Sequence, residues 1–136
     1  AVGAATGAVA GLVAITPAAG STDVMGAFFI GSISSVVCYL AATKLKLAFN
    51  YDDSLDVFGV HGIGGIFGTI MIAVFGTGTW AAQIGSLVIV GVFTVMVTFA
   101  LVKLVALVTP LRVSEEDEYT GLDLSAHGER AYDHSS

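Results

Sequence analysis

The chain has 136 residues, of which 55% are hydrophobic and 12% are charged, and its mean hydropathy is +0.87. Soluble domains usually carry about 25% charged residues, so this chain has too few charges to cover a surface that faces water. Its formal net charge is -6, which argues against nucleic-acid binding because that function needs a basic surface. The composition therefore predicts an integral membrane protein.

Four stretches of the chain meet or approach the length of about 20 helical residues that a bilayer core of about 30 Å requires. The first is residues 2–19, which is rich in alanine and glycine and ends in a cluster of helix-breaking residues around Pro17. The second is residues 24–43. It contains Cys38, which has no disulfide partner within the chain and which we interpret as a small buried apolar side chain.

A polar loop rich in aspartate separates the second stretch from the third, which we place at residues 57–75. The fourth spans residues 80–108, begins at Trp80, an aromatic residue suited to the membrane interface, and ends before Pro110. We therefore expect an all-α, polytopic bundle of four transmembrane helices within residues 1–109, followed by an acidic tail over residues 110–136.

The basic residues predict the orientation of the chain. With four crossings, all the lysines and arginines fall on the side of the membrane where the first helix starts: Lys44, Lys46, Lys103, Arg112 and Arg130. By the positive-inside rule this side is cytoplasmic. We therefore expect a multi-pass protein of the plasma membrane whose C-terminal tail lies in the cytoplasm.

Glycines recur every four residues on two of the expected helices. Gly3, Gly7 and Gly11 form a stripe on the first, and Gly64 and Gly68 form another on the third. Small residues at this spacing let helix backbones approach closely in lipid. The pattern predicts a compact bundle with more neighbouring helices than four alone supply.

His61 is the main functional candidate. No other ionisable side chain lies between residues 57 and 102, and ionisable groups within a membrane are costly and usually functional. A neutral imidazole can both donate and accept a hydrogen bond. The alternative is a buried histidine whose ring is satisfied by a neighbouring carbonyl group, and spacing alone does not separate the two.

Asp56 lies at the start of the third helix. We expect its carboxylate to cap the helix by accepting hydrogen bonds from the first free N–H groups, where its negative charge also suits the helix dipole. Direct attraction of a cation is the alternative.

Three motifs carry a resemblance to a known family. They are the segment from Tyr51 to Gly62, which reads Tyr-Asp-Asp-Ser-Leu-Asp-Val-Phe-Gly-Val-His-Gly, the segment from Gly7 to Ala18, and a tail motif in two parts, Leu111 to Glu116 and Gly121 to Glu129. In order and spacing they resemble the tenth helix, the eighth helix and the cytoplasmic tail of Amt-type ammonium transporters. Gly62 favours the Amt branch over the related Rh branch, which has an asparagine at this position.

The resemblance implies a function and a mechanism. Amt proteins are homotrimers whose eleven-helix subunits each contain a narrow pore with two facing histidines, and His61 matches the second of these. Ammonium is drawn to an outer site and gives up its proton, and ammonia then passes the apolar pore along the histidines. Thr6 and Val57 match residues that line the pore toward its cytoplasmic mouth, with ordinary helix packing as the alternative.

The family's N-terminal repeat, which carries the first pore histidine and the outer ammonium site, has no counterpart in this sequence. We expect the chain to form an incomplete pore on its own and to need the missing N-terminal half of the subunit. A fragment, a truncated product or one piece of a split subunit would each fit this expectation.

An acidic tail is usually a solvated arm. The resemblance instead implies that it couples neighbouring subunits and meets PII-type signal proteins. The residues that would carry this regulation are Gly121, Asp123, Ser125, His127 and Gly128. Phosphate on Ser125 would repel Asp123, whereas two tail histidines, His127 and His134, are weak evidence for a metal site and we expect none.

We therefore expect part of an ammonia-conducting subunit, with ammonium or ammonia as substrate, the lipid bilayer as surroundings, no cofactor and no enzymatic activity. The alternative is a non-conducting membrane protein that senses ammonium or docks signal proteins through its tail.

Overall fold

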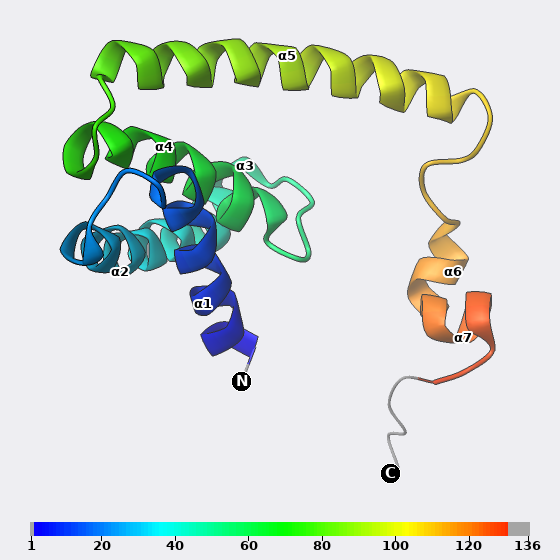
Figure 1. Ribbon diagram of the computed structural model, residues 1–136. Coiled ribbons are helices and arrows are strands. Elements are labelled where there is room, and N and C mark those ends of the chain that lie inside the picture. Colours follow the sequence, from blue (N-terminus) through cyan, green and yellow to red (C-terminus); the bar gives the residue numbers. More distant parts are fainter. Residues whose placement is uncertain (1, 131–136) are drawn as a thin grey trace. The chain divides into compact units, whose positions relative to one another are not determined.

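The computed structural model describes residues 2–130, and the end of the expected tail, including His134, lies outside the described residues. All regular structure among the described residues is helical (Figure 1), which confirms the all-α class. Three helical runs are long and apolar enough to cross a membrane: Val24–Phe49, Phe58–Phe75 and Trp80–Ala106. A shorter apolar run, Gly3–Ala18, precedes them.

The chain forms two compact units, Ala1–Val92 and Phe93–Ser136. The first contains helix α1 (Val2–Ile15), which continues into the 3-10 turn η1 (Thr16–Ala18). Pro17, which has no N–H to donate, lies in the first residues of η1, where the helix changes from α to 3-10 geometry shortly before it ends. Helix α1 packs against α2 (Val24–Leu40) and α4 (Ile63–Phe75), so these three helices form the bundle of the first unit.

Helix α2 starts at an aspartate cap and runs further than the sequence indicated. The Asp23 carboxylate accepts a hydrogen bond from the Gly26 N–H at 2.7 Å. After Leu40 the helix continues through the π turn η2 (Ala41–Leu45) and α3 (Lys46–Phe49), where we had expected an end near residue 43. Lysine favours helices, and its long side chain can reach water from a membrane edge. The helix ends at Asn50, whose φ of 48° is left-handed.

A second π turn, η3 (Phe58–Gly62), opens the next membrane-spanning run and continues into α4. The π turns η2 and η3 contact each other. They approach closely at Gly59, where a Cβ would lie 3.1 Å from both the N and the Cα of Ala42. A side chain at Gly59 would therefore push the two turns apart.

The core of the first unit consists of small and medium-sized side chains in two clusters. One joins Ala10, Cys38 and Val60, and the other joins Ala14, Ala18 and Ile30. Cys38 is buried, as expected from its apolar surroundings in the sequence. Among the glycines, Gly64 and Gly68 are buried, whereas a Cβ at Gly3 or Gly7 would meet nothing within 4 Å. Only part of the glycine pattern therefore serves packing within this chain.

Helix α5 (Trp80–Ala106) is a single apolar rod of 27 residues, none of which is buried. Near its end the Lys103 ammonium lies 5.5 Å from the centre of the Phe99 ring. The second unit contains the end of α5, from Phe93 onward, and two short helices, α6 (Glu115–Thr120) and α7 (Leu122–His127). Gly121 separates them with a left-handed φ of 95°.

Candidate functional site

His61 lies in the π turn η3 and is exposed, whereas its neighbours Gly59 and Val60 are buried. A π turn inserts one extra residue, so the side chains before and after it are offset relative to a continuous α-helix, and such turns are frequent at functional sites. Val57, four residues earlier, is also exposed, at 53%. The imidazole therefore points away from the core of the first unit and is not buried among the described residues of that unit.

The start of η3 is capped by Asp53 rather than by Asp56. The Asp53 carboxylate accepts hydrogen bonds from the N–H groups of Val57 and Phe58, at 2.8 and 2.9 Å. Our expectation that Asp56 caps this helix was therefore wrong. The reason is local, because Asp56 adopts a left-handed φ of 54° and its carboxylate turns to Lys46 instead.

Lys46 connects the end of the preceding helix to this turn. Its ammonium group lies 2.9 Å from Oδ1 of Asp56 and also donates to the carbonyl oxygen of Asp53. Both side chains of the ion pair are partly buried, with exposures of 28% and 34%. Sequence reasoning missed this role of Lys46, which we had used only to orient the chain. The signal was the presence of three aspartates within ten residues of a lysine that ends an apolar helix.

Two aromatic rings lie over the capped turn. Tyr51 contacts Phe58 edge-on, with 5.6 Å between ring centres, and the Tyr51 hydroxyl is buried without a hydrogen-bond partner among residues 2–130. A Cβ at Gly62 would lie 2.9 Å from Cδ2 of Phe58. The glycine after His61 therefore leaves room for the Phe58 ring, which accounts for Gly62 in packing terms.

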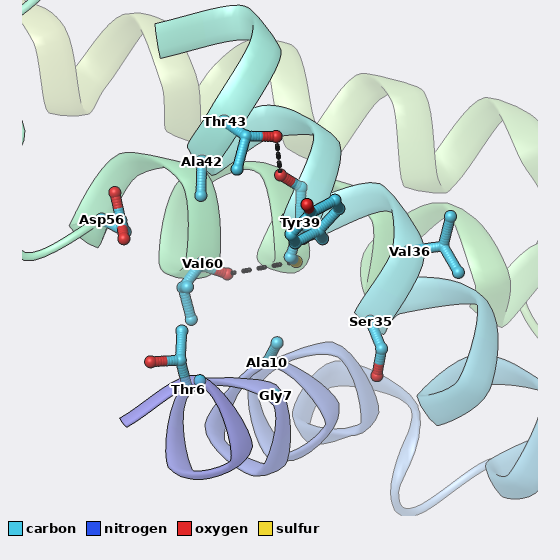
Figure 2. A pocket seen from close by; sticks show the side chains of 12 residues that line it. Thr6, Gly7, Ala10, Ser35, Val36, Tyr39, Ala42, Thr43, Asp56 and Val60 are labelled. Atoms are coloured by element: carbon cyan, nitrogen blue, oxygen red, sulfur yellow. Dashed lines mark hydrogen bonds between the residues drawn. The ribbon is translucent and has the colours of Figure 1, made fainter. Parts of the chain in front are cut away.

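A cavity of about 570 Å³ lies between α1, α2 and the two π turns. Figure 2 shows Thr6 and Ala10 of α1 on one side and Val60 and Asp56 on the other. Its walls are mainly small or apolar side chains. Polar groups are few, and the Thr43 hydroxyl donates to the carbonyl oxygen of Tyr39 at 2.7 Å.

The structure separates the expected site residues into two groups. Thr6 and Asp56 line the cavity, whereas Val57 and His61 do not. Tyr39 and Thr43, which sequence reasoning did not single out, also line it. Their spacing of four residues places them on one helix face, and that was the available signal.

The tail residues that we singled out cluster at the turn around α7. The Ser125 N–H donates to the carbonyl oxygen of Gly121 at 2.9 Å, and the Gly128 N–H donates to that of Leu124 at 3.0 Å. Oδ1 of Asp123 accepts from the Leu124 N–H at 2.9 Å. His127 ends α7 and is exposed. These residues therefore organise a short helical turn on a solvent-facing segment.

Helix α6 is bounded by an ion pair. Arg112 binds both carboxylate oxygens of Glu118, at 2.6 and 3.0 Å. This hydrogen bonding lowers the pKa of Glu118 from its ordinary value of 4.5.

Over residues 2–130 no group of three or more His, Cys, Asp or Glu side chains could hold a metal ion.

Comparison with known proteins relates this chain to transporters. The sequence model of the Ammonium Transporter Family matches residues 1–132. An ammonium transporter of Bacillus subtilis is 44% identical over 98% of this chain and 37% of its own length. Ammonium transporters of Aquifex aeolicus and Archaeoglobus fulgidus are 42% and 40% identical, each over 96% of this chain.

The chain spans about a third of the length of these curated relatives, with 34% to 37% of each covered. The match to the family runs through both the membrane-spanning helices and most of the tail. The resemblance drawn from the three sequence motifs is thereby confirmed, and the chain belongs to the ammonium transporter family.

Proposed function

We propose that the chain contributes the His61 side of the conduction path in an Amt-type ammonium transporter subunit. One observation carries the proposal: an otherwise apolar membrane-spanning run holds one ionisable side chain, and that side chain points out of the first unit. An imidazole in this position can be reached by substrate or by another segment of the subunit. Membership of the family supplies the substrate class, ammonium or ammonia.

The proposed mechanism moves ammonia rather than ammonium past His61. Placing a charged group at the centre of a bilayer costs at least about 2.5–3.5 kcal/mol on insertion scales. Uncharged ammonia avoids most of this cost. A neutral imidazole replaces part of its lost hydration, because the ring offers one donor and one acceptor. The role is transport rather than catalysis, and no cofactor takes part in it.

Val57 and Thr6 serve the same path in different ways. Val57 lies four residues before His61 and is exposed as His61 is, so its side chain gives the path an apolar wall next to the imidazole. Thr6 lines the cavity between α1 and the π turns, opposite Asp56 (Figure 2). We assign Thr6 to the cytoplasmic mouth of the path.

The complete transporter would be a homotrimer in the plasma membrane. The remainder of each subunit would supply the first pore histidine and the outer ammonium site, because the chain covers only about a third of its relatives' length. The tail would lie in the cytoplasm and meet a PII-type signal protein through Gly121, Asp123, Ser125, His127 and Gly128. Their exposed or half-exposed positions support this assignment.

The test is ammonium uptake by proteoliposomes that contain a complete subunit. This chain would replace the aligned segment of the Bacillus subtilis relative, with which it shares 44% identity. We expect His61→Ala to lower uptake about tenfold or more, because a polar group left without its partner costs about 1–3 kcal/mol. Val74→Ala, an exposed position on the same helix, is the control and should leave uptake unchanged.

Unchanged uptake in His61→Ala, with the oligomer intact by gel filtration, would contradict the pore role. The chain alone should show no uptake in the same assay. If the complete subunit also shows none but still binds a PII-type protein, the rival role of a non-conducting sensor or docking protein is favoured.

A further inference from the structure

We infer that Lys46 is a positioning residue for the conduction path, because it clamps the turn that carries His61 to the end of the preceding helix. The inference rests on the proposed function of His61. Lys46 itself lies in α3 and touches neither His61 nor Val57 in any hydrogen bond or ion pair among residues 2–130. Its effect is transmitted through the two aspartates that it holds.

The clamp has two points of contact on one short loop. The Lys46 ammonium group donates to the carbonyl oxygen of Asp53 and pairs with Oδ1 of Asp56 at 2.9 Å. It therefore holds both ends of the four-residue segment formed by residues 53–56, which is joined to η3 through Val57. One end also carries the carboxylate that caps the turn, since Asp53 accepts the Val57 and Phe58 N–H groups.

Asp56 shows why the segment needs to be held. Its φ of 54° lies in the left-handed region, which is unfavourable for a residue with a Cβ. The Asp56 carbonyl oxygen accepts the Val60 N–H at 2.9 Å, so Asp56 provides an early acceptor for the helical run that contains η3. Strained residues persist where surrounding contacts hold them, and the Lys46 ion pair is such a contact.

A third contact lies between the two π turns themselves. A Cβ at Gly59 would lie 3.1 Å from backbone atoms of Ala42, so η2 and η3 touch through their main chains. The Gly59–Ala42 contact sets the distance between the turns, and Val60 of η3 packs against Ala10 and Cys38. These contacts hold the buried side of η3, whereas Lys46 holds the segment that leads into it, and His61 lies on the exposed side of the same turn.

Charge alone is the competing explanation. Asp56 lines the cavity, and without Lys46 its carboxylate would be available to hold a cation there. The two explanations differ in what repairs the loss of Lys46. If only the unpaired charge matters, neutralising Asp56 restores transport, whereas a clamp is restored only by another cationic side chain.

The experiment uses the same complete subunit in proteoliposomes and compares four variants. We expect Lys46→Met to lower the maximal uptake rate roughly tenfold, less than the roughly hundredfold that a misplacement of about 1 Å can cost an enzyme, with little change in apparent KM. Lys46→Arg should retain most of the rate. Lys46→Met combined with Asp56→Asn should stay low, and Lys44→Met should match the unmodified subunit, since no ion pair of Lys44 occurs among residues 2–130.

Normal uptake in Lys46→Met, recovery on adding Asp56→Asn, or equal loss in Lys46→Arg would each overturn the inference. A second readout does not depend on transport. With Cys38→Ser and His61→Cys in place, the labelling rate of the introduced thiol by a membrane-impermeant reagent should change on adding Lys46→Met but not Lys44→Met. If the unmodified subunit does not conduct, the proposed function fails, and an unchanged labelling rate would then overturn the clamp separately.

Discussion

At Gly68, helix α4 passes so close to α1 that a Cβ would overlap the carbonyl oxygen of Ala14 and lie 3.0 Å from its Cα. Backbone atoms cannot move aside as a flexible side chain can. We therefore expect Gly68→Ala to destabilise the bundle by about 1–3 kcal/mol, the usual cost of overpacking. Gly65→Ala is the matched control, because a Cβ there meets nothing within 4 Å. Thermal unfolding in detergent compares the two, and equal midpoints would refute the close contact.

Single residues also show which features of the structure could be predicted from the sequence. The burial of Cys38 and of Gly68 was expected from apolar context and from small-residue spacing. The choice between Asp53 and Asp56 as the cap was not predictable, since both precede the helix by a few residues. It depends on the left-handed φ of Asp56 and on the Lys46 contact, which bring together parts of the chain ten residues apart.

Helix α6 depends on groups at both of its ends. Ser114 caps its N-terminus by accepting the Asp117 N–H at 3.1 Å, and Arg112 binds Glu118. Because Arg112 lowers the pKa of Glu118 below 4.5, the ion pair stabilises the segment fully above that pH. This stabilisation is lost as the pH falls through the lowered pKa. We expect Arg112→Gln to raise the Glu118 titration midpoint, measured by carboxyl NMR in the detergent-solubilised chain.

Glu116→Gln is the control for this titration, since Glu116 precedes the paired residue on the same helix and forms no ion pair within residues 2–130. It should leave the Glu118 midpoint nearly unchanged. A Glu118 midpoint that is the same with and without Arg112 would contradict the effect of the ion pair.

Among the secondary-structure elements, the positions of the helices could be predicted from the sequence, but the π turns could not. Four apolar stretches were visible from length and hydropathy, and each contains a helix. The π turns η2 and η3 were not foreseen, because they form where two helices meet at Ala42 and Gly59 rather than from local preference. Since His61 lies in η3, its direction could not be derived from a regular helical repeat.

On the scale of the whole molecule, the described residues bury little of their own apolar surface. Ile30 and Ser34 are the largest fully buried side chains, whereas most large apolar side chains are exposed. A water-soluble domain of this size would be stabilised mainly by its core, and here the core consists chiefly of alanines and glycines. Lipid and further protein segments are therefore the natural surroundings of these helices.

The predicted orientation of the whole chain does not require all four expected helices to cross the membrane. Lys44 and Lys46 lie near the end of Val24–Phe49, and two further runs, Phe58–Phe75 and Trp80–Ala106, lead to Arg112. If both runs cross the membrane, all three basic residues lie on one side, whether or not the shorter Gly3–Ala18 crosses. The turn at residues 76–79 carries no basic residue.

The positive-inside rule therefore places the C-terminus in the cytoplasm and the turn at residues 76–79 on the other side of the membrane. Green fluorescent protein fused to the C-terminus should fluoresce in bacteria, and alkaline phosphatase inserted at residues 76–79 should be active. The reverse pattern would place the tail outside and would contradict the proposed contact with a cytoplasmic signal protein.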